Sequence, residues 1–318
     1  MKFTPITLEA SKYLNEMTTF ITEMRFIDAL KVTDIVSDLV DSVRFGNVEY
    51  GKGITVTFKK KLQPVKDLSE TSSALTITKP EVYQETIEID NYKFVPISFS
   101  IQLARDAVLN GTLLAEFNAF LMDLLSETEV FHFYDLVVAG IMAYTPTQAT
   151  QTITVNLKDT SSLSGADLRA TQEWNASEIA KAVRKTANNM KVKSTKFTDL
   201  STTITAVPTA DLRVYMNDTF ETDLIADALA TLYHGEKIEA FIPNKGMILL
   251  PEDSVDANNK NTICWLCHKN KFALADFYKL TQSFTDPSTL YTNTFYHFAY
   301  GFGVFKSLPC VKFVANYQ

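Results

Sequence analysis

The residues of this 318-residue chain whose types and spacing could best support chemistry form the run Cys264-Trp265-Leu266-Cys267-His268. The run matches C-x-x-C-H, the pattern of covalent haem attachment, and its thiols could also begin a zinc site. The same residues are typical of a strand, in which a spacing of three places Cys264 and Cys267 on opposite faces. Because two thiolates on opposite faces cannot share a metal, we favour buried reduced thiols and expect neither metal nor cofactor.

No other motif favours an enzyme. The sequence lacks a phosphate-binding P-loop, a G-x-S-x-G nucleophile elbow and an H-E-x-x-H pair. The remaining candidate ligands are Cys310, His132, His234 and His297, and none of them stands beside a nucleophile. We therefore expect a protein without catalytic residues.

Composition excludes further classes. A formal net charge of −7 argues against a dedicated nucleic-acid binder, which would show a basic field. The N-terminus shows no apolar signal-peptide core, and the uncharged stretch 136–157 contains Thr, Gln and Pro146, which makes it a poor membrane span. We expect a soluble protein that is made inside the cell and does not contact a membrane.

Residues 46–99 predict an extended hairpin loop. Apolar residues alternate with polar ones in residues 54–59 and again within 82–99, and residues 67–73 have the composition of a turn. A two-stranded ribbon buries little apolar surface and is marginally stable alone. We therefore expect it to pack on another copy of the same chain.

The two arms of this ribbon carry opposite charges. Residues 46–66 hold five lysines against one glutamate, and residues 67–92 hold six acidic residues against one lysine. An antiparallel register would bring Lys59, Lys60 and Lys61 near Glu81 and Glu85, where each opposite-charge pair contributes about 0.2 to 1 kcal/mol. We predict that these five residues make contacts between subunits. The alternative is a hairpin whose charges serve only to keep it solvated.

Helices are predicted on both sides of the ribbon. Residues 20–43 carry one apolar face, and after Ser100 apolar residues recur every three or four positions. Gly111 separates a short first helix from a longer one. Because residues 97–145 contain no proline, the longer helix can reach about 25 to 30 residues, or about 40 Å.

A second α/β unit is predicted from Asn175, which with Glu178 three residues later matches a capping box at a helix start. Residues 212–216 predict a buried strand, and residues 219–233 another helix. Strand signals rich in aromatic residues follow to the C-terminus. We expect these aromatic side chains to pack in the core, because basic residues are not interleaved among them as in a base-stacking surface.

The order of these elements resembles the major capsid proteins of tailed bacteriophages, the family with the Hong Kong 97 capsid fold. The phrases that carry the resemblance are GKGITVT at residues 51–57 and ETIEIDNYKF at residues 85–94, followed by the helix after Ser100. The resemblance implies an α+β fold with an N-terminal arm, an extended β-hairpin loop, a long spine helix, a peripheral domain and an axial domain. No lysine and asparagine pair for cross-linking between subunits can be identified.

The resemblance also implies a division of the chain into five parts. These are an N-terminal arm and helix at 1–45, the extended hairpin loop at 46–99, a peripheral domain with the spine helix at 100–174, an axial domain at 175–258, and C-terminal strands at 259–318 that return to the peripheral and axial core.

The function implied by the resemblance is structural. Copies of the chain would assemble as hexamers and pentamers into an icosahedral virion shell around double-stranded phage DNA, which they would bind without sequence specificity. Assembly would take place in the host bacterial cytoplasm, with scaffolding and portal proteins as further partners.

Two alternatives remain open. An encapsulin-type compartment would enclose cargo protein in place of DNA, and a cytoplasmic metal or haem protein would use Cys264, Cys267 and His268. Particle formation separates the two shells from the metal protein, and the contents of the particles separate one shell from the other.

Overall fold

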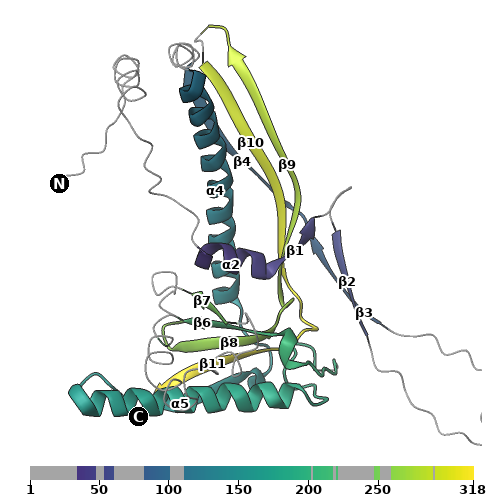
Figure 1. Ribbon diagram of the computed structural model, residues 1–318. Coiled ribbons are helices and arrows are strands. Elements are labelled where there is room, and N and C mark those ends of the chain that lie inside the picture. Colours follow the sequence, from purple (N-terminus) through teal and green to yellow (C-terminus); the bar gives the residue numbers. More distant parts are fainter. Residues whose placement is uncertain are drawn as a thin grey trace, which may run out of the picture.

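The computed structural model describes residues 34–47, 54–60, 82–100, 111–201, 203–217, 220, 247–250, 259–288 and 291–318. Within these residues the chain forms two units, each built on one sheet, and a two-stranded ribbon that projects from them (Figure 1). We call them the elongated unit, the five-stranded unit and the ribbon. The combination of helices and strands confirms the predicted α+β class.

The elongated unit pairs a long sheet with one long helix. Its sheet has the order β1-β9-β10-β4, formed by Arg44–Asn47, Phe272–Asp286, Tyr291–Val304 and Asn91–Ser100. Helix α4, Gly111–Ala143, has 33 residues and runs alongside the strands (Figure 1). At 1.5 Å per helical residue and about 3.4 Å per strand residue, α4 and the 15-residue β9 both span about 50 Å. The predicted long helix is thus confirmed, and it is longer than expected.

Helix α4 buries a row of side chains at every fourth position, which lie along one face because four residues make about one helical turn. This row consists of Leu125, Glu129, Phe133, Val137 and Ile141. The Phe133 ring packs edge-on against the rings of Phe298 and Tyr300 in β10, at centroid distances of 5.7 and 5.4 Å. The contact joins helix and sheet.

Helix α2, Asp34–Val43, crosses α4 and leads directly into β1 (Figure 1). Leu39, Val40 and Val43 are buried in the same apolar cluster as the C-terminal half of α4. The rest of the helix predicted over residues 20–43 lies outside the described residues.

The five-stranded unit has a mixed sheet in the order β5-β11-β8-β6-β7. Its strands β5 and β11 are parallel, as are β6 and β7, and β8 runs antiparallel to both of its neighbours. The strands are Thr152–Leu157, Cys310–Tyr317, Thr262–His268, Leu212–Asn217 and Met247–Leu250. The short 3-10 helices Ala149–Gln151 and Thr209–Asp211 precede β5 and β6.

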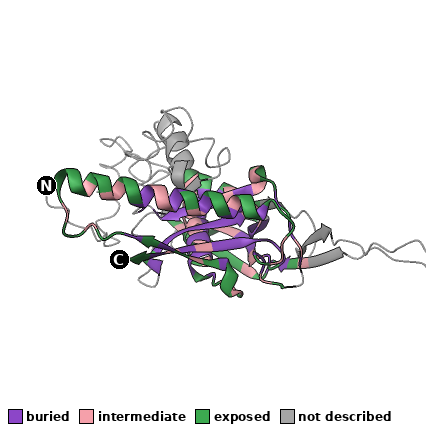
Figure 2. Cartoon of the chain, turned by 90° about the horizontal axis from the view of Figure 1, so that it is seen from below, coloured by how far each residue is buried: buried purple, intermediate pink, exposed green. Residues whose placement is uncertain are grey.

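This second sheet is covered on both faces. Helix α5, Gly165–Met190, packs its apolar side on one face (Figure 2). The end of α4 and helix α2 contribute to the cluster on the other face. The central strand β8 consequently has five successive residues, 263–267, that are at most 1% exposed. A continuous apolar run of this kind is expected where both faces of a strand are buried.

The ribbon pairs β2, Ile54–Lys60, with β3, Val82–Glu88, in an antiparallel sheet of its own. The predicted hairpin is confirmed for these strands, but the predicted return arm is divided. Its second half is β4, which joins the elongated sheet beside β10. The alternation of apolar residues continues through both strands, so the sequence pattern does not mark the point where the chain passes from ribbon to body.

The helix start predicted at Asn175 is wrong, because α5 begins at Gly165 and runs through it. The Asn175 amide hydrogen-bonds both the backbone N–H and the carbonyl of Lys158, at 2.8 and 3.0 Å. This tertiary pairing satisfies the hydrogen-bonding groups of the Asn175 side chain, which would otherwise favour a helix cap over a helix interior. The five-stranded unit therefore includes residues before 175.

The buried strand predicted at 212–216 is confirmed as β6. Of the helix predicted over 219–233, only Phe220 is among the described residues, and it is helical. No described helix has the length and apolar character that a membrane crossing requires.

Candidate interaction surfaces

The cysteine motif lies on a buried strand, as predicted. Cys264 belongs to the apolar cluster beneath α5, whereas Cys267 belongs to the cluster on the opposite face, where it pairs across the strands with Cys310. All three cysteines are free and buried. Burial raises the pKa of the Cys264 and Cys267 thiols well above the usual range. Protonated thiols are poor nucleophiles and poor metal ligands.

The last residue of the motif, His268, accepts a hydrogen bond at Nδ1 from the backbone N–H of Asn270. Among the described residues, no group of three His, Cys, Asp or Glu side chains is arranged to hold a metal ion.

The strand register locates the charged residues of the ribbon. Lys59 is opposite Tyr83 and Lys60 is opposite Val82, while Glu85 is opposite Thr57. Lys61 and Glu81 lie outside the described residues. The register agrees with the antiparallel arrangement expected from the charges. Contacts between these lysines and acidic residues stay a prediction.

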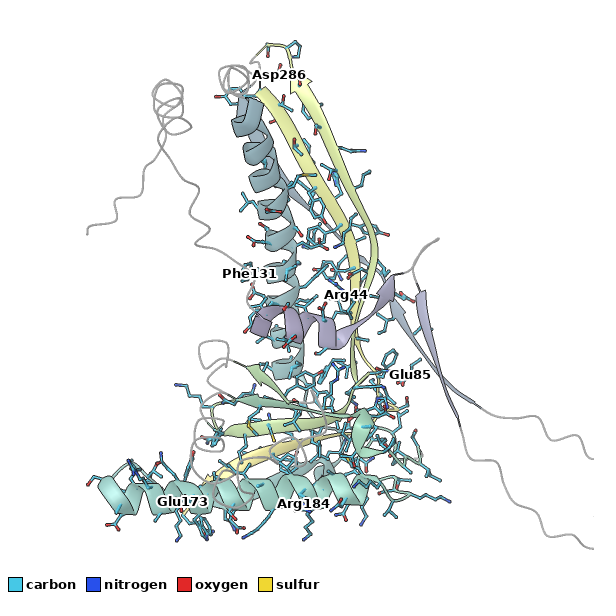
Figure 3. The ribbon with its side chains drawn as sticks, in the orientation of Figure 1. Arg44, Glu85, Phe131, Glu173, Arg184 and Asp286 are labelled. Atoms are coloured by element: carbon cyan, nitrogen blue, oxygen red, sulfur yellow. The ribbon has the colours of Figure 1, made fainter. Side chains whose placement is uncertain are left out.

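Glu85 has a full set of partners within its own chain. Its carboxylate accepts hydrogen bonds from the backbone N–H of Lys306 at 2.8 Å, from the backbone N–H of Ser307 at 3.1 Å, and from the Ser307 hydroxyl. Both residues that supply these three donors lie in the turn between β10 and β11. Figure 3 shows Glu85 at the base of the ribbon, beside this part of the body. Of the five residues predicted to join subunits, Glu85 is the one whose side chain the structure describes, and its partners lie inside the chain.

Strand β3 rests on the body through alternate residues. Ile87 and Ile89 are buried and Glu85 is half-buried, while Thr86 and Glu88 are exposed. Ile87 packs in a small cluster with Ala273, Phe305 and Leu308. These contacts and the Glu85 carboxylate form one row that joins the ribbon to the end of the elongated sheet.

Two glycines allow β3 to approach the body. A Cβ at Gly301 would collide with the backbone carbonyl of Glu88, and a Cβ at Gly303 would lie 2.9 Å from Ile87 Cγ1. Neither position accommodates a larger residue without a shift of β3.

The elongated sheet has one covered and one open face. On the covered face Phe298 and Tyr300 pack against α4. On the open face, Phe284 stacks on Phe295 at 5.9 Å and Phe94 lies 5.7 Å from the His297 ring. These four residues line a shallow cavity of about 670 Å³ together with Gln282 and Ser283.

The prediction that the C-terminal aromatic residues pack in the core is therefore confirmed for one face of this sheet and not for the other. Phe94 and Phe284 are each 56% exposed. Alternation in the sequence reveals that a strand has two faces, but it does not tell which of them the chain covers.

A buried ion pair lies where the two units meet. Lys271 Nζ is 2.6 Å from Asp199 Oδ2, and neither side chain is accessible beyond a few per cent. Tyr144 donates its hydroxyl hydrogen bond to Asp199 Oδ1 at 2.7 Å, and Gln151 donates to the same oxygen at 3.1 Å. Burial alone raises the pKa of the Asp199 carboxyl, but the charge of Lys271 and these hydrogen bonds outweigh burial and lower it.

Two more acidic residues are buried in the elongated unit. Glu129 of α4 pairs with Lys279 at 2.9 Å and accepts the Tyr296 hydroxyl at 2.6 Å. Asp276 of β9 pairs with Arg44 at 3.1 Å, but its other oxygen has no hydrogen-bond partner. Burial raises the pKa of the Asp276 carboxyl, and the positive charge of Arg44 offsets only part of this effect.

Sequence reasoning missed all of these pairs, because their members are far apart in the chain. Glu129 offers one signal that could have been used: it lies four residues from both Leu125 and Phe133, in the middle of an apolar row. None of these arrangements brings a nucleophile to a base in an accessible cavity. The described surfaces suit contact and support.

Comparison with known proteins points to one family. A family model described as "Phi29-like phage major capsid protein" matches residues 39–314. No curated protein sequence matches the chain.

Solved structures give the same picture at low sequence identity. The capsid structure of the cyanophage P-SCSP1u has a TM-score of 0.56 and 14% identity, and the match covers 93% of this chain and 94% of that chain. The capsid structure of Staphylococcus phage Andhra has a TM-score of 0.60 and 9% identity, covering 92% and 88%. The mature capsid of bacteriophage PhiM1 has a TM-score of 0.57 and 10% identity, covering 92% and 90%. These likenesses show the fold, which is the capsid fold that the sequence resemblance implied.

Proposed function

The chain belongs to the Phi29-like phage major capsid proteins, and from this membership we propose that its copies form hexamers and pentamers that close into an icosahedral shell around double-stranded DNA. Membership of this family makes the protein a structural one, a major capsid protein that assembles with further copies of itself into the virion capsid.

The observation that carries the proposal is the family match over residues 39–314, with the ribbon inside the matched region. The β2–β3 ribbon is a separate sheet that extends away from both units (Figure 1). Two strands alone bury too little apolar surface for independent stability. A neighbouring copy would supply the missing surface, and closed symmetry would let every copy both give and receive this contact.

We assign the two units to the two expected domains. The elongated unit, with α4 as its spine helix, would be the peripheral domain, and the five-stranded unit would be the axial domain at the centre of a capsomer. The C-terminal strands support this division, since β8 and β11 lie in the five-stranded unit and β9 and β10 lie in the elongated unit. The axial part would begin near β5, earlier in the chain than residue 175.

The lysine run is proposed to act between subunits. Lys59, Lys60 and Lys61 would meet acidic groups of a neighbouring ribbon or body, with Glu81 as a partner on the return arm. Exposed pairs of this kind contribute about 0 to 1 kcal/mol each, so their weight would come from repetition around the shell.

Further partners follow from the proposed shell. Scaffolding and portal proteins would guide assembly in the host bacterial cytoplasm, and packaged DNA would be held without sequence-specific binding. The net charge of −7 supports this view, because a negatively charged lining would not bind tightly a genome that must leave. We propose no enzymatic activity.

The alternatives have less support. Nothing in the comparisons favours an encapsulin-type compartment. The metal or haem protein needs Cys264 and Cys267 to converge on one ligand, and these residues belong to clusters on opposite faces of β8.

The test is electron microscopy of the purified protein beside a variant with a shortened ribbon. Phe58 is opposite Gln84 and Thr57 is opposite Glu85. Replacing residues 58–84 with Asn-Gly, a two-residue hairpin turn, gives a ribbon-less variant that lacks the outer part of the ribbon but keeps its four innermost residue pairs, 54–57 with 85–88. We expect shells, tubes or sheets from the full chain, and a folded but unassembled variant.

Circular dichroism and sedimentation check that the ribbon-less variant is folded. Intact shells from this variant would contradict the role of the ribbon, and a monodisperse monomer from the full chain at high concentration would contradict the shell itself. DNA in particles recovered from phage-infected cells and treated with nuclease separates a genome shell from a cargo compartment.

A further inference from the structure

The base of the ribbon is held to its own chain at three alternate residues. Ile89 and Ile87 each pack in a small apolar cluster of the body. The outermost contact is Glu85, which accepts hydrogen bonds from Lys306 and Ser307. It lies about 7 Å beyond Ile87 along the strand. Without the outermost contact the strand can bend at Ile87, whereas with it the direction in which the ribbon continues is set.

We propose that Glu85 is a positioning residue for assembly: its carboxylate fixes the direction in which the ribbon leaves the body, and so presents the ribbon to a neighbouring copy. The inference rests on the proposed function, because it assumes that the ribbon joins subunits. It assigns Glu85 a role inside the subunit that prepares the contact between subunits.

The chemistry of the contact suits this role. Two of the donors are backbone N–H groups in the turn that joins β10 to β11, and each of these strands is an interior strand of one of the two sheets. Backbone donors cannot change rotamer, so they hold the carboxylate in one place. Hydrogen bonds to an ionised acceptor are also shorter and stronger than neutral ones. Glu85 and Glu88 are the ionisable residues of the ribbon whose side chains the structure describes, and of these two Glu85 makes such contacts to the body.

Small changes of direction have large effects at the far end of the ribbon. Without Glu85, the outermost residue of β3 that packs on the body is Ile87. From Ile87 the strand continues for five residues to its outer end at Val82, over about 17 Å. A rotation of about 20° at Ile87 would move the outer end of β3 by about 6 Å, more than one strand spacing of about 4.8 Å. A ribbon displaced so far could not pair in register with a neighbour.

The direct test measures the direction of the ribbon in unassembled subunits. Spin labels would be placed on Lys60→Cys, at the end of β2, and on Lys181→Cys, an exposed residue of α5. The three native cysteines are buried and leave these two sites as the reactive ones. Pulsed electron resonance then gives the distribution of distances between the labels. We expect a narrow distribution that Glu85→Ala broadens at least twofold.

Two further variants make the measurement specific. Glu88→Ala lies on the same strand but on its exposed side, and should leave the distribution narrow. Glu85→Gln retains one acceptor oxygen without the charge, and should give an intermediate width. It also serves if Glu85→Ala does not fold, which hydrogen exchange of α5 would reveal.

Assembly of the unlabelled variants is the second measurement. We expect Glu85→Ala to reduce the yield of closed shells at least tenfold in sedimentation, while Glu88→Ala matches the unmodified chain. An unchanged distance distribution in Glu85→Ala would overturn the inference, and so would a broadened distribution with a normal yield of shells. If the unmodified chain forms no shells, the proposed function fails, and the distance measurement still decides whether Glu85 fixes the ribbon.

Discussion

The two sheets of this protein differ in how much of their apolar surface their own chain covers. In the five-stranded sheet both faces of β8 are closed, by α5 on one side and by α2 and the end of α4 on the other. In the elongated sheet the described residues close only one face: Phe298 beneath α4 is 4% exposed, whereas Phe284 on the open face is 56% exposed. Within the described part of the chain, the first sheet is covered on both faces and the second on one.

Two buried carboxylates give a second contrast. At the junction of the units, Asp199 has Lys271, Tyr144 and Gln151 as partners, and the net effect lowers its pKa. In the elongated unit, Asp276 has one cationic partner and an oxygen without a partner, and burial raises its pKa. The contrast concerns these two carboxylates and not whole sheets, because the indole N–H of Trp265 in the closed strand β8 also has no hydrogen-bond partner. Apolar faces left uncovered in a subunit commonly mark contact surfaces.

The largest loss of subunit stability should follow from breaking the Lys271–Asp199 ion pair at the junction of the two units. Lys271→Met removes one partner of a fully buried pair and leaves the Asp199 carboxylate without its counter-charge, which typically costs about 3 to 5 kcal/mol. Denaturant unfolding of the subunit would measure the loss of stability.

The matched control for this variant is Lys269→Met. Lys269 lies two residues before Lys271 in the sequence and makes a partly exposed pair with Asp211. Its replacement should lower the free energy of unfolding by no more than about 1 kcal/mol. Equal stabilities of the two variants would show that the junction pair does not hold the units together.

The two faces of the elongated sheet offer the next comparison. Phe298→Ala should cost the subunit about 3 kcal/mol, because it opens a cavity between β10 and α4. Phe284→Ala on the open face should cost less than about 1 kcal/mol, because its ring is mostly in water already.

Thermal or denaturant unfolding of Phe298→Ala and Phe284→Ala compares the two losses of stability. A loss for Phe284→Ala as large as that for Phe298→Ala would mean that a part of the same chain covers the open face.

A smaller effect is expected from pH. The Asp276 carboxyl has a folded-state pKa above its ordinary value of 3.8, so the folded protein takes up this proton before the unfolded chain does. Its contribution to stability is fully present below pH 3.8 and is lost as the pH rises through the folded-state value. The residues that act on it are Arg44, Lys279, Glu129 and Asp41.

Asp276→Asn removes this titration. The stability of the unmodified protein relative to Asp276→Asn should therefore increase as the pH falls from 7 towards 4, which unfolding measured at each pH would show. A relative stability that decreases over the same range would mean that Asp276 is stabilised as an anion, like Asp199.

These contrasts also show what the sequence can predict. Strand β8 and the opposite placement of Cys264 and Cys267 follow from a period of two, and the long helix α4 follows from an apolar pattern without proline. These are local properties of the chain. The predicted start of α5 is wrong because Asn175 and Glu178 also fit a capping box. In the structure, the Asn175 amide hydrogen-bonds the backbone of Lys158 instead, a tertiary contact that the local sequence does not indicate.

The pairs that join distant elements leave no local pattern. Lys271 and Asp199 are 72 positions apart, and Glu85 and Ser307 are 222 positions apart. The charges of the ribbon suggested that Glu85 faces a neighbouring subunit. In the structure, Glu85 accepts hydrogen bonds from Lys306 and Ser307, in a turn whose closeness to Glu85 no local sequence pattern indicates.

The smallest effect on the subunit is expected from the lysine run. Replacing Lys59, Lys60 and Lys61 with glutamate should change the free energy of unfolding by no more than about 1 kcal/mol, because exposed pairs contribute little. The same change should impair assembly at low salt, since the repulsion recurs in every copy of the shell. One reversal alone, Lys59→Glu, should be nearly silent.

Salt distinguishes electrostatics from misfolding in the triple variant. At about 1 M salt the screening length falls to about 3 Å, so assembly should be partly restored if repulsion is the cause. A triple glutamine variant removes the charge without reversing it, and should lie between the two. Light scattering across a salt series measures all three proteins. Normal assembly of the glutamate variant at low salt would mean that the lysines are only solvated, and failure at every salt concentration would mean that the substitutions damage the ribbon itself.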